Sequence, residues 1–275
     1  MELIAGIDVG GTKIAAGLVD PESGTVTRRI EQRTGAERGP LVVLADCVAL
    51  ASKLGAARVG LGLCEMIGLD GTPLSAVTVD WRRTDVVGAF PVPCAVSSDV
   101  VASAIAEARF GAGRGLGSFL YVSIGTGISH CLVLGGVPWV GARGAAIVTG
   151  APMIEEVASG KALAGATGEQ RRAAAQALGL SLAALIGGLD PEALVVGGGL
   201  GLDRGYRAHW EPALREAIWW PPTRDLAVRS AELGADAGIV GAALGCSARK
   251  CLTLSGGTPR YAVVPSAICS VFRSE

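Results

Sequence analysis

A glycine turn near the start of the chain constrains the fold more than any other stretch. The segment from Asp8 to Lys13 reads Asp-Val-Gly-Gly-Thr-Lys, and it lies between the apolar runs Leu3–Ile7 and Ile14–Val19. Two apolar runs joined by glycines predict two strands and a tight turn, with an acid where the first strand ends. The pattern differs from the GxxxxGK[ST] loop, which leads into a helix, and from GxGxxG. We therefore expect a β-hairpin.

The residues of this turn suit a phosphate group. Gly10 and Gly11 let the backbone approach a phosphate closely, and Thr12 adds a hydroxyl donor. Asp8 can hold Mg²⁺ through water. An ordinary turn with a solvated Lys13 is the alternative that this segment alone leaves open.

Composition and charge bound the class of protein. The chain has 275 residues, which is long enough for two lobes. Half of the residues are apolar and 18% are charged, which allows each lobe a sizeable core, and the net charge is −1. Because the charges are scattered, we expect no nucleic-acid partner and no membrane partner. No apolar run approaches the ~18 residues of a membrane span. The first expected strand begins at Leu3, so neither a targeting segment nor a DNA-binding module is expected ahead of it.

Cysteine usage predicts a reduced, cytoplasmic protein. The chain has seven cysteines, an odd number, with no CxxC pair and no metal-ligand spacing. Such a set is typical of free thiols rather than of disulfides or a zinc site. The cysteines are Cys47, Cys64, Cys94, Cys131, Cys246, Cys251 and Cys269.

Strand-like and helix-like segments alternate along the chain, which predicts an α/β fold. After the first hairpin we expect strands at residues 25–31, 59–63, 94–96, 118–123, 130–134, 193–196 and 226–228, and helices at 41–54, 100–110, 169–189 and 235–248.

Two hairpins with glycine turns suggest a duplicated fold with a central cleft. We expect an N-terminal α/β lobe at residues 1–110 and a C-terminal α/β lobe at 111–236. A final helix at 237–248 would pack back on the N-terminal lobe. Residues 249–275 lack periodicity and form an irregular tail to which we assign no function.

Asp99 is the candidate general base. It follows a short apolar strand and precedes a helix, so its carboxylate is expected at the carboxyl edge of a sheet. A carboxylate there can accept the proton of a hydroxyl that attacks a phosphoryl group. The alternative is helix capping by Ser98 and Asp99, worth about 1 kcal/mol, and capping is compatible with catalysis.

Other motifs carry weaker signals. Gly125-Thr126-Gly127 is a second donor turn, suited to the outer phosphates. Gly197–Gly199 could let backbone pass under an adenine or ribose, or could form a tight strand–helix connection. His130 and His209 are isolated, which favours packing or surface roles over metal ligation. Trp219 and Trp220 are expected to form a packed corner, with stacking on a base as the alternative.

In combination these segments resemble the ROK family of bacterial sugar kinases, within the actin-like ATPase superfamily. The resemblance covers about residues 3–245, and its order and spacing are specific. It implies a two-lobed, ribonuclease H-like fold and an ATP- and Mg²⁺-dependent kinase for a hydroxyl of a sugar-like ring. The segments that carry it are Gly6–Lys13, Ser98-Asp99, Glu107–Arg114, Gly125–Gly127, Gly141–Gly144, Ala158–Gly160, Leu189–Glu192 and Gly197–Gly199.

The resemblance also implies roles for individual residues. Asp99 matches the catalytic base, and Ser98 stands where the family has an asparagine that holds sugar hydroxyls. Glu155 matches a sugar-contacting acid. Glu65 and Asp80 would line the substrate side, or serve as ordinary loop residues. Nucleotide and magnesium would be held by Asp8, Gly10, Gly11, Thr12, Lys13, Gly125, Thr126, Gly127, Gly197, Gly198 and Gly199.

The chain departs from the family where the sugar is gripped. The usual Glu-x-Gly-His element reads Val148-Thr-Gly-Ala151 here, and no cysteine lies between Ala151 and Ser159, so no zinc is expected. A site built to bond a hydroxyl rejects analogues that lack it. Losing these polar groups favours a cyclitol over glucose, as in the C7-cyclitol kinase branch found in aminocyclitol antibiotic pathways. The alternatives are a hexose kinase with an atypical pocket and a non-catalytic sugar or nucleotide sensor. A homodimer is left open.

Overall fold

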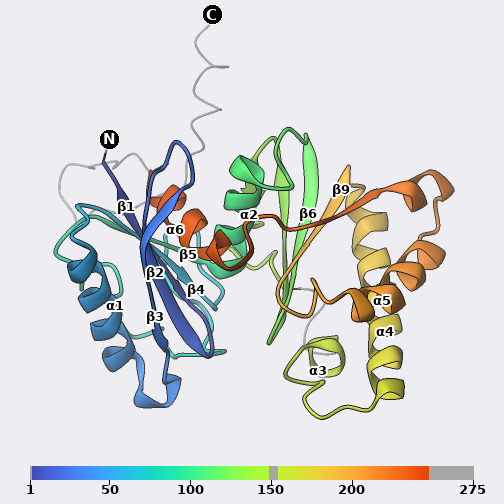
Figure 1. Cartoon of the computed structure of the whole chain (residues 1–275), viewed down its shortest axis with the longest axis horizontal. Coiled ribbons are helices and arrows are strands. Elements are labelled where there is room, and N and C mark those ends of the chain that lie inside the picture. Colours follow the sequence, from blue (N-terminus) through green and yellow to red (C-terminus); the bar gives the residue numbers. More distant parts are fainter. Residues whose placement is uncertain (1, 149–153, 248–275) are drawn as a thin grey trace, which may run out of the picture. The chain divides into compact units, whose positions relative to one another are not determined.

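The computed structural model describes residues 2–148 and 154–247, which form two α/β units, each built on a mixed sheet (Figure 1). Of the described residues, the first unit takes in 2–106, 141–145 and 235–247. The second takes in 107–140, 146–148 and 154–234. The expected α/β class is confirmed. The predicted tail at 249–275, with Cys251 and Cys269, lies outside the described residues.

The sheet of the first unit has the strand order β3-β2-β1-β4-β5. Strands β1, β2 and β3 pair antiparallel, whereas β4 and β5 continue the sheet in parallel with β1. The expected first hairpin is therefore present. The strands are β1 (Ile4–Val9), β2 (Lys13–Val19), β3 (Val26–Arg33), β4 (Val59–Leu63) and β5 (Cys94–Ser98), and the helices are α1 (Pro40–Leu54), α2 (Asp99–Phe110) and α6 (Ala237–Ser247).

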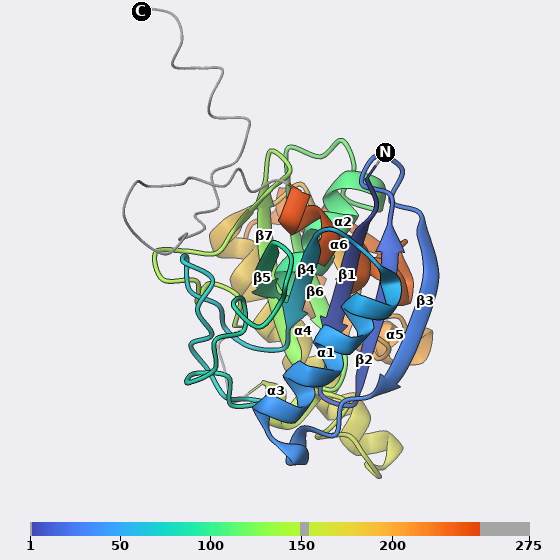
Figure 2. The ribbon, with the colours of Figure 1, turned by 90° about the vertical axis from the view of Figure 1, so that its left-hand side faces the viewer.

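The two faces of this sheet carry different side chains. Ile7 and Leu61 belong to the buried core on the face covered by α1 (Figure 2). Because successive residues of a strand point to opposite faces, Gly6 and Gly60 point the other way, toward α6. A Cβ at Gly60 would overlap the Ala242 carbonyl oxygen of α6. The glycines therefore let the α6 backbone lie directly on the sheet.

The same close approach occurs between α6 and α2, and it leads to a stability prediction. A Cβ at Gly241 would overlap the carbonyl oxygen of Ala102, whereas a Cβ at Gly245, one turn later in α6, would meet no atom within 4 Å. We expect Gly241→Ala to lower the free energy of unfolding by about 3 kcal/mol through overpacking. Gly245→Ala should raise it by up to about 1 kcal/mol, since alanine favours a helix over glycine. Urea unfolding of both variants tests this, and equal stabilities would contradict the packing described.

The sheet of the second unit has the order β10-β9-β6-β7-β8. Strand β9 lies parallel to β6 and β10, and β7 lies antiparallel to β6 and β8. The strands are β6 (Ser118–Ile124), β7 (Ile128–Leu134), β8 (Val137–Trp139), β9 (Ala193–Gly197) and β10 (Ala227–Ser230), and the helices are α3 (Glu155–Ala158), α4 (Gly168–Leu189) and α5 (Arg204–Ala217).

Helix α4 is long and apolar enough to cross a membrane by length and composition, so the prediction that no segment reaches this size was wrong. Its sequence is apolar for another reason. Leu178, Leu182 and Ile186 are fully buried in the core of the second unit, where α4 packs against α5. A long helix in a protein core can therefore have the length and composition of a membrane span.

Helix α5 has no counterpart among the expected helices. Asp203 caps its N-terminus by accepting a hydrogen bond from the Tyr206 N–H at 2.7 Å. Tyr206, Trp210 and Leu214 are its buried residues, spaced four apart, so they form one apolar stripe. Pro212 lies inside the helix, and a proline there normally argues against one.

The prediction that Trp219 and Trp220 form a packed corner was wrong. The two indole rings stack on each other with centroids 6.0 Å apart, but Trp219 is 84% exposed and Trp220 is 56% exposed. They follow the end of α5, and two prolines after them begin a short 3-10 helix, Pro221–Asp225. The aromatic pair therefore lies on the surface of the second unit.

Candidate active site

Asp8 occupies the end of β1 on the face that α6 covers. Its Cα is in register with Gly62 of β4, and a Cβ at Gly238, in the first turn of α6, would overlap its carboxylate. The pKa of Asp8 is raised to about 7, first by burial and then by the negative charge of Asp99, while the positive charge of Lys13 opposes both. The carboxylate is therefore held in a place where a cation would favour its ionised form.

Asp99 begins α2, directly after β5. Its Oδ1 accepts a hydrogen bond from the Val100 N–H at 2.7 Å and a longer one from the Ser98 hydroxyl at 3.3 Å. Burial raises the pKa of Asp99, while these donors and the Cys64 thiol lower it. Gly62 separates the two acids, because its Cβ would lie 3.7 Å from both the Asp8 Oδ1 and the Asp99 Cα. The first unit thus brings the two sequence-predicted acids together.

The turn between β1 and β2 is fixed by a residue outside the motif. The Gly10 N–H donates to the Lys13 carbonyl at 3.0 Å, and the buried Thr34 hydroxyl donates to the Gly10 carbonyl at 2.7 Å. The Thr34 N–H also donates to the Thr12 carbonyl at 3.1 Å. Within the described chain, the N–H groups of Gly11 and Thr12 donate to no acceptor. They remain available to an anion.

The Lys13 side chain is directed toward the neighbouring strand β3 and is ion-paired there, so its ammonium group is not free at the turn. Its Nζ lies 2.6 Å from the Glu31 carboxylate on β3, which Arg29 also contacts at 2.7 Å. The side chain of Lys13 is half exposed. Its charge nevertheless lowers the pKa of Asp8, so it still acts on the site electrostatically.

Glu65 is buried and organises a loop. One carboxylate oxygen accepts hydrogen bonds from the Ser75 hydroxyl at 2.5 Å and the Val77 N–H at 2.7 Å. The other accepts from the Thr78 N–H at 2.7 Å and the Val79 N–H at 3.0 Å. Four donors satisfy both oxygens, which leaves little capacity for substrate hydroxyls. The structure therefore supports the loop role that the sequence left open.

Asp80 lies at the exposed end of this loop. Both of its oxygens pair with the Arg82 guanidinium, at 2.8 and 2.9 Å. The hydrogen bonds from Arg82 are the main reason that the pKa of Asp80 falls to about 2. An exposed acid paired with its near neighbour is what an ordinary loop residue shows.

The second glycine turn, Gly125–Gly127, joins β6 to β7. The Gly160 N–H donates to the Gly125 carbonyl at 2.7 Å, and the Lys161 N–H donates to the Thr126 carbonyl at 3.2 Å. A Cβ at Gly125 would meet nothing within 4 Å. The N–H groups of Thr126 and Gly127 donate to no acceptor within residues 2–148 and 154–247. This turn, too, has room and donors for a phosphate.

Different constraints act on the three glycines of Gly197–Gly199. A Cβ at Gly197 would overlap the Tyr121 hydroxyl of β6, and Gly198 has a φ of +80°. Packing and backbone conformation therefore explain the first two. A Cβ at Gly199 would meet nothing within 4 Å. The N–H groups of the next two residues donate to the Ile124 carbonyl, so this loop lies beside the second turn.

Glu155 and Val148 lie near the second turn. The Glu155 carboxylate accepts a hydrogen bond from the Ile128 N–H at 3.2 Å, and its Oε1 would be 3.2 Å from a Cβ at Gly127. Val148 is 37% exposed and forms an isolated bridge with Ser129 of β7. Ala151 lies outside the described residues.

The two histidines have separate environments. His130 is buried on β7, and burial lowers its pKa to about 4, so it is neutral at neutral pH. His209 is exposed on α5. Over the described ranges, no three acids, histidines or cysteines cluster as a metal site would require.

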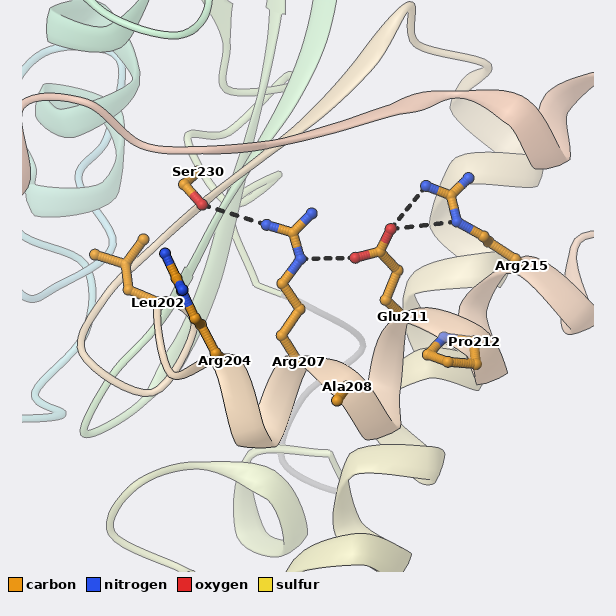
Figure 3. Close-up of a pocket in the computed structure, with 8 residues that line it drawn as sticks. All are labelled: Leu202, Arg204, Arg207, Ala208, Glu211, Pro212, Arg215 and Ser230. Carbon is orange, nitrogen blue, oxygen red and sulfur yellow. Dashed lines mark hydrogen bonds and ion pairs between the residues drawn. The ribbon is translucent and has the colours of Figure 1, made fainter.

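A groove on the second unit is lined by three arginines, and two of them make structural contacts that hold α5 in place (Figure 3). Arg207 and Arg215 both pair with Glu211, at 2.6 and 2.7 Å. Arg207 also donates to the Val228 carbonyl and the Ser230 hydroxyl of β10. These bonds attach α5 to the edge strand, and the groove contains none of the sequence-predicted residues.

Thr34, Cys64, Thr78 and Ser159 were not among the expected site residues. The sequence around Thr34 gives no sign of its role, because Thr34 is distant in sequence from Gly10 and Thr12 and meets them only in the folded chain. The Ser159 hydroxyl accepts a hydrogen bond from the Ala162 N–H at 3.2 Å beside the second turn. Ser159 lies within Ala158–Gly160, one of the segments that carry the family resemblance, so the sequence did contain a signal for it. Cys64 lies next to both Thr78 and Asp99, but the three residues are far apart in the sequence, so only the fold brings them together.

Comparison with known proteins places the chain among sugar kinases. A family model described as ROK family matches residues 4–160. A glucokinase of Streptomyces coelicolor is 29% identical over 88% of this chain and 97% of its own length. An N-acetylmannosamine kinase of Haemophilus influenzae is 24% identical over 86% of this chain and 93% of its own.

A solved structure agrees with this likeness. The ROK family glucokinase from Streptomyces griseus, determined in complex with glucose and AMPPNP, superposes with a TM-score of 0.77 and 28% identity. The match covers 88% of this chain and 98% of that one. The two-lobed actin-like ATPase fold that the sequence implied is thereby confirmed.

Proposed function

The chain belongs to the ROK family, and from this we propose that it is an ATP-dependent kinase that phosphorylates a hydroxyl of a sugar-like ring. The observation that carries the proposal is the pair of acids Asp8 and Asp99, at the ends of the two strands that flank β4, each with a raised pKa. A non-catalytic binder has no need of a base there. ATP use is supported by the nucleotide analogue bound to the Streptomyces griseus relative.

The residues present fit a nucleotide with Mg²⁺. Both turns offer N–H groups that donate to no acceptor in the described parts of the chain, and the space beside Gly125 is open. Asp8 would hold Mg²⁺ through water, and the ion would relieve the repulsion between the two carboxylates. When bound, it neutralises charge on the transferring phosphates. Asp99 would accept the proton of the attacking hydroxyl.

We infer that the acceptor is a cyclitol of the C7 type, with a hexose as the alternative. Val148 presents an apolar, partly exposed side chain beside β7, where the family resemblance places an acid. An apolar wall does not demand the hydroxyls of a hemiacetal edge. Glu155, next to the second turn, remains the acid proposed for the substrate. The hexose alternative is favoured by the relatives, which are a glucokinase and an N-acetylmannosamine kinase.

The test is a coupled ADP-release assay over hexoses, N-acetylhexosamines and cyclitols. We expect kcat/KM for a cyclitol to exceed that for glucose by about tenfold or more. Glucose turnover well above that of every cyclitol would overturn the cyclitol inference and leave a hexose kinase. No turnover with any acceptor would favour a sensor. A cytoplasmic location, as free thiols at Cys47, Cys64, Cys94, Cys131 and Cys246 suggest, is part of the proposal.

A further inference from the structure

Cys64 is the first residue after β4 and lies next to Asp99. Strands β4 and β5 run parallel with Leu63 in register with Ser98, so the next residue of each chain segment falls side by side. The Cys64 N–H donates to the Val9 carbonyl at 3.2 Å, which fixes it at the end of the sheet. Cys64 therefore belongs to the same row of strand ends as the two acids.

A chain of polar contacts runs from a buried acid to the proposed base. The Glu65 carboxylate holds the Thr78 N–H at 2.7 Å. The Cys64 thiol lies between the Thr78 side chain and the Asp99 carboxylate and is placed to interact with both. The Thr78 methyl group would be 3.7 Å from a Cβ at Gly11, so this side chain also borders the first glycine turn.

We propose that Cys64 and Thr78 are positioning residues for the base: Thr78 orients the thiol, and the thiol orients the Asp99 carboxylate toward the acceptor hydroxyl. This rests on the proposed kinase function. The Val100 N–H and Ser98 hydroxyl that bond Asp99 come from its own chain segment. Cys64 contacts the carboxylate from a different strand, and two directions of contact fix its rotation better than one.

The thiol is suited to donate and is a poor nucleophile. Burial and the neighbouring Asp99 carboxylate raise the pKa of Cys64 well above its usual range, so it stays protonated at neutral pH. A protonated thiol is a donor whose bond to a carboxylate is charge-assisted. Cys64 therefore acts on the reaction only through Asp99.

The kinetic test uses paired variants that keep or remove each donor. Cys64→Ala should lower kcat by about five- to tenfold, with the KM for ATP little changed, because one hydrogen bond to the base is lost. Cys64→Ser keeps a hydroxyl donor and should recover most of that loss. Thr78→Val and Thr78→Ser should behave as the corresponding pair. If the alanine and serine variants of Cys64 lose activity equally, or neither loses any, Cys64 only fills space and the proposal is overturned.

A second readout does not depend on turnover. Trypsin cleavage after Arg58 and Arg82 gives a peptide, residues 59–82, in which Cys64 is the single cysteine. Iodoacetamide labelling of this peptide, followed by mass spectrometry, should be several-fold faster in Asp99→Asn than in wild type, because the carboxylate no longer suppresses the thiolate. Equal rates would refute the contact and the proposal. If wild type phosphorylates no acceptor but labelling responds to Asp99→Asn, the contact exists and it is the kinase function that fails, and the catalytic role of Cys64 falls with it.

Discussion

Replacing Asp99 with asparagine is expected to lower kcat by about a hundred- to ten-thousandfold while the protein stays folded. The amide cannot take the proton of an acceptor hydroxyl. Its carbonyl oxygen can still accept the Val100 N–H, which the native Oδ1 accepts at 2.7 Å, so the start of α2 is preserved. Stability should be unchanged or raised, because the native carboxylate is buried against Asp8.

The matched control is Asp225→Asn, the same chemical change at an exposed acid in the second unit. The measurement is acceptor-dependent ADP release at saturating ATP, together with circular dichroism and a thermal melt of each protein. The control should retain wild-type turnover. Near-normal turnover by Asp99→Asn would remove Asp99 as the base.

Replacing Asp8 with asparagine is expected to abolish Mg²⁺-dependent phosphoryl transfer and, at the same time, to stabilise the ligand-free protein at pH 8. The pKa of Asp8 is raised in the folded state from 3.8 to about 7. Between those pH values the folded protein binds more protons than the unfolded one, so Asp8 makes stability fall as pH rises through this window. Above pH 7 the full cost of the ionised group is present, and asparagine removes it.

We expect Asp8→Asn to gain about 2 kcal/mol at pH 8, roughly half of what the full displacement of the pKa corresponds to, because the residue is partly exposed. Urea unfolding without nucleotide or Mg²⁺, at pH 5 and pH 8, measures the effect. The difference between variant and wild type should be larger at pH 8. A variant less stable than wild type at pH 8 would contradict the environment described for Asp8.

Local patterns predicted much of the fold because their signals lie within single elements. The first hairpin follows from two apolar runs around Gly10 and Gly11, and α1 follows from a continuous apolar segment ended by Gly55, which has a left-handed φ of +69°. Helix α5 was missed because Pro212 lies inside it and hid the stripe of Tyr206 and Trp210. The exposed tryptophans after α5 were misjudged, since large aromatic side chains are usually buried.

The site could be predicted only in part, because its contacts join distant segments. Asp8 and Asp99 stand at strand ends, a position that an apolar run followed by an acid makes visible. Glu65 organises a loop through donors such as the Thr78 N–H, and Thr34 fixes the first turn through the Gly10 carbonyl. Both roles join residues that are distant in the sequence. No spacing along the chain indicates that a thiol would reach Asp99.

The most direct test of the kinase assignment follows the phosphoryl group itself. Wild type and Asp99→Asn would be incubated with ATP, Mg²⁺ and a panel of cyclitols and hexoses, and the acceptors analysed by mass spectrometry alongside ADP. We predict that wild type converts at least one ring polyol to its monophosphate with an equal amount of ADP, and that Asp99→Asn forms neither. ADP without phosphorylated acceptor, or product formed equally by both proteins, would contradict the account.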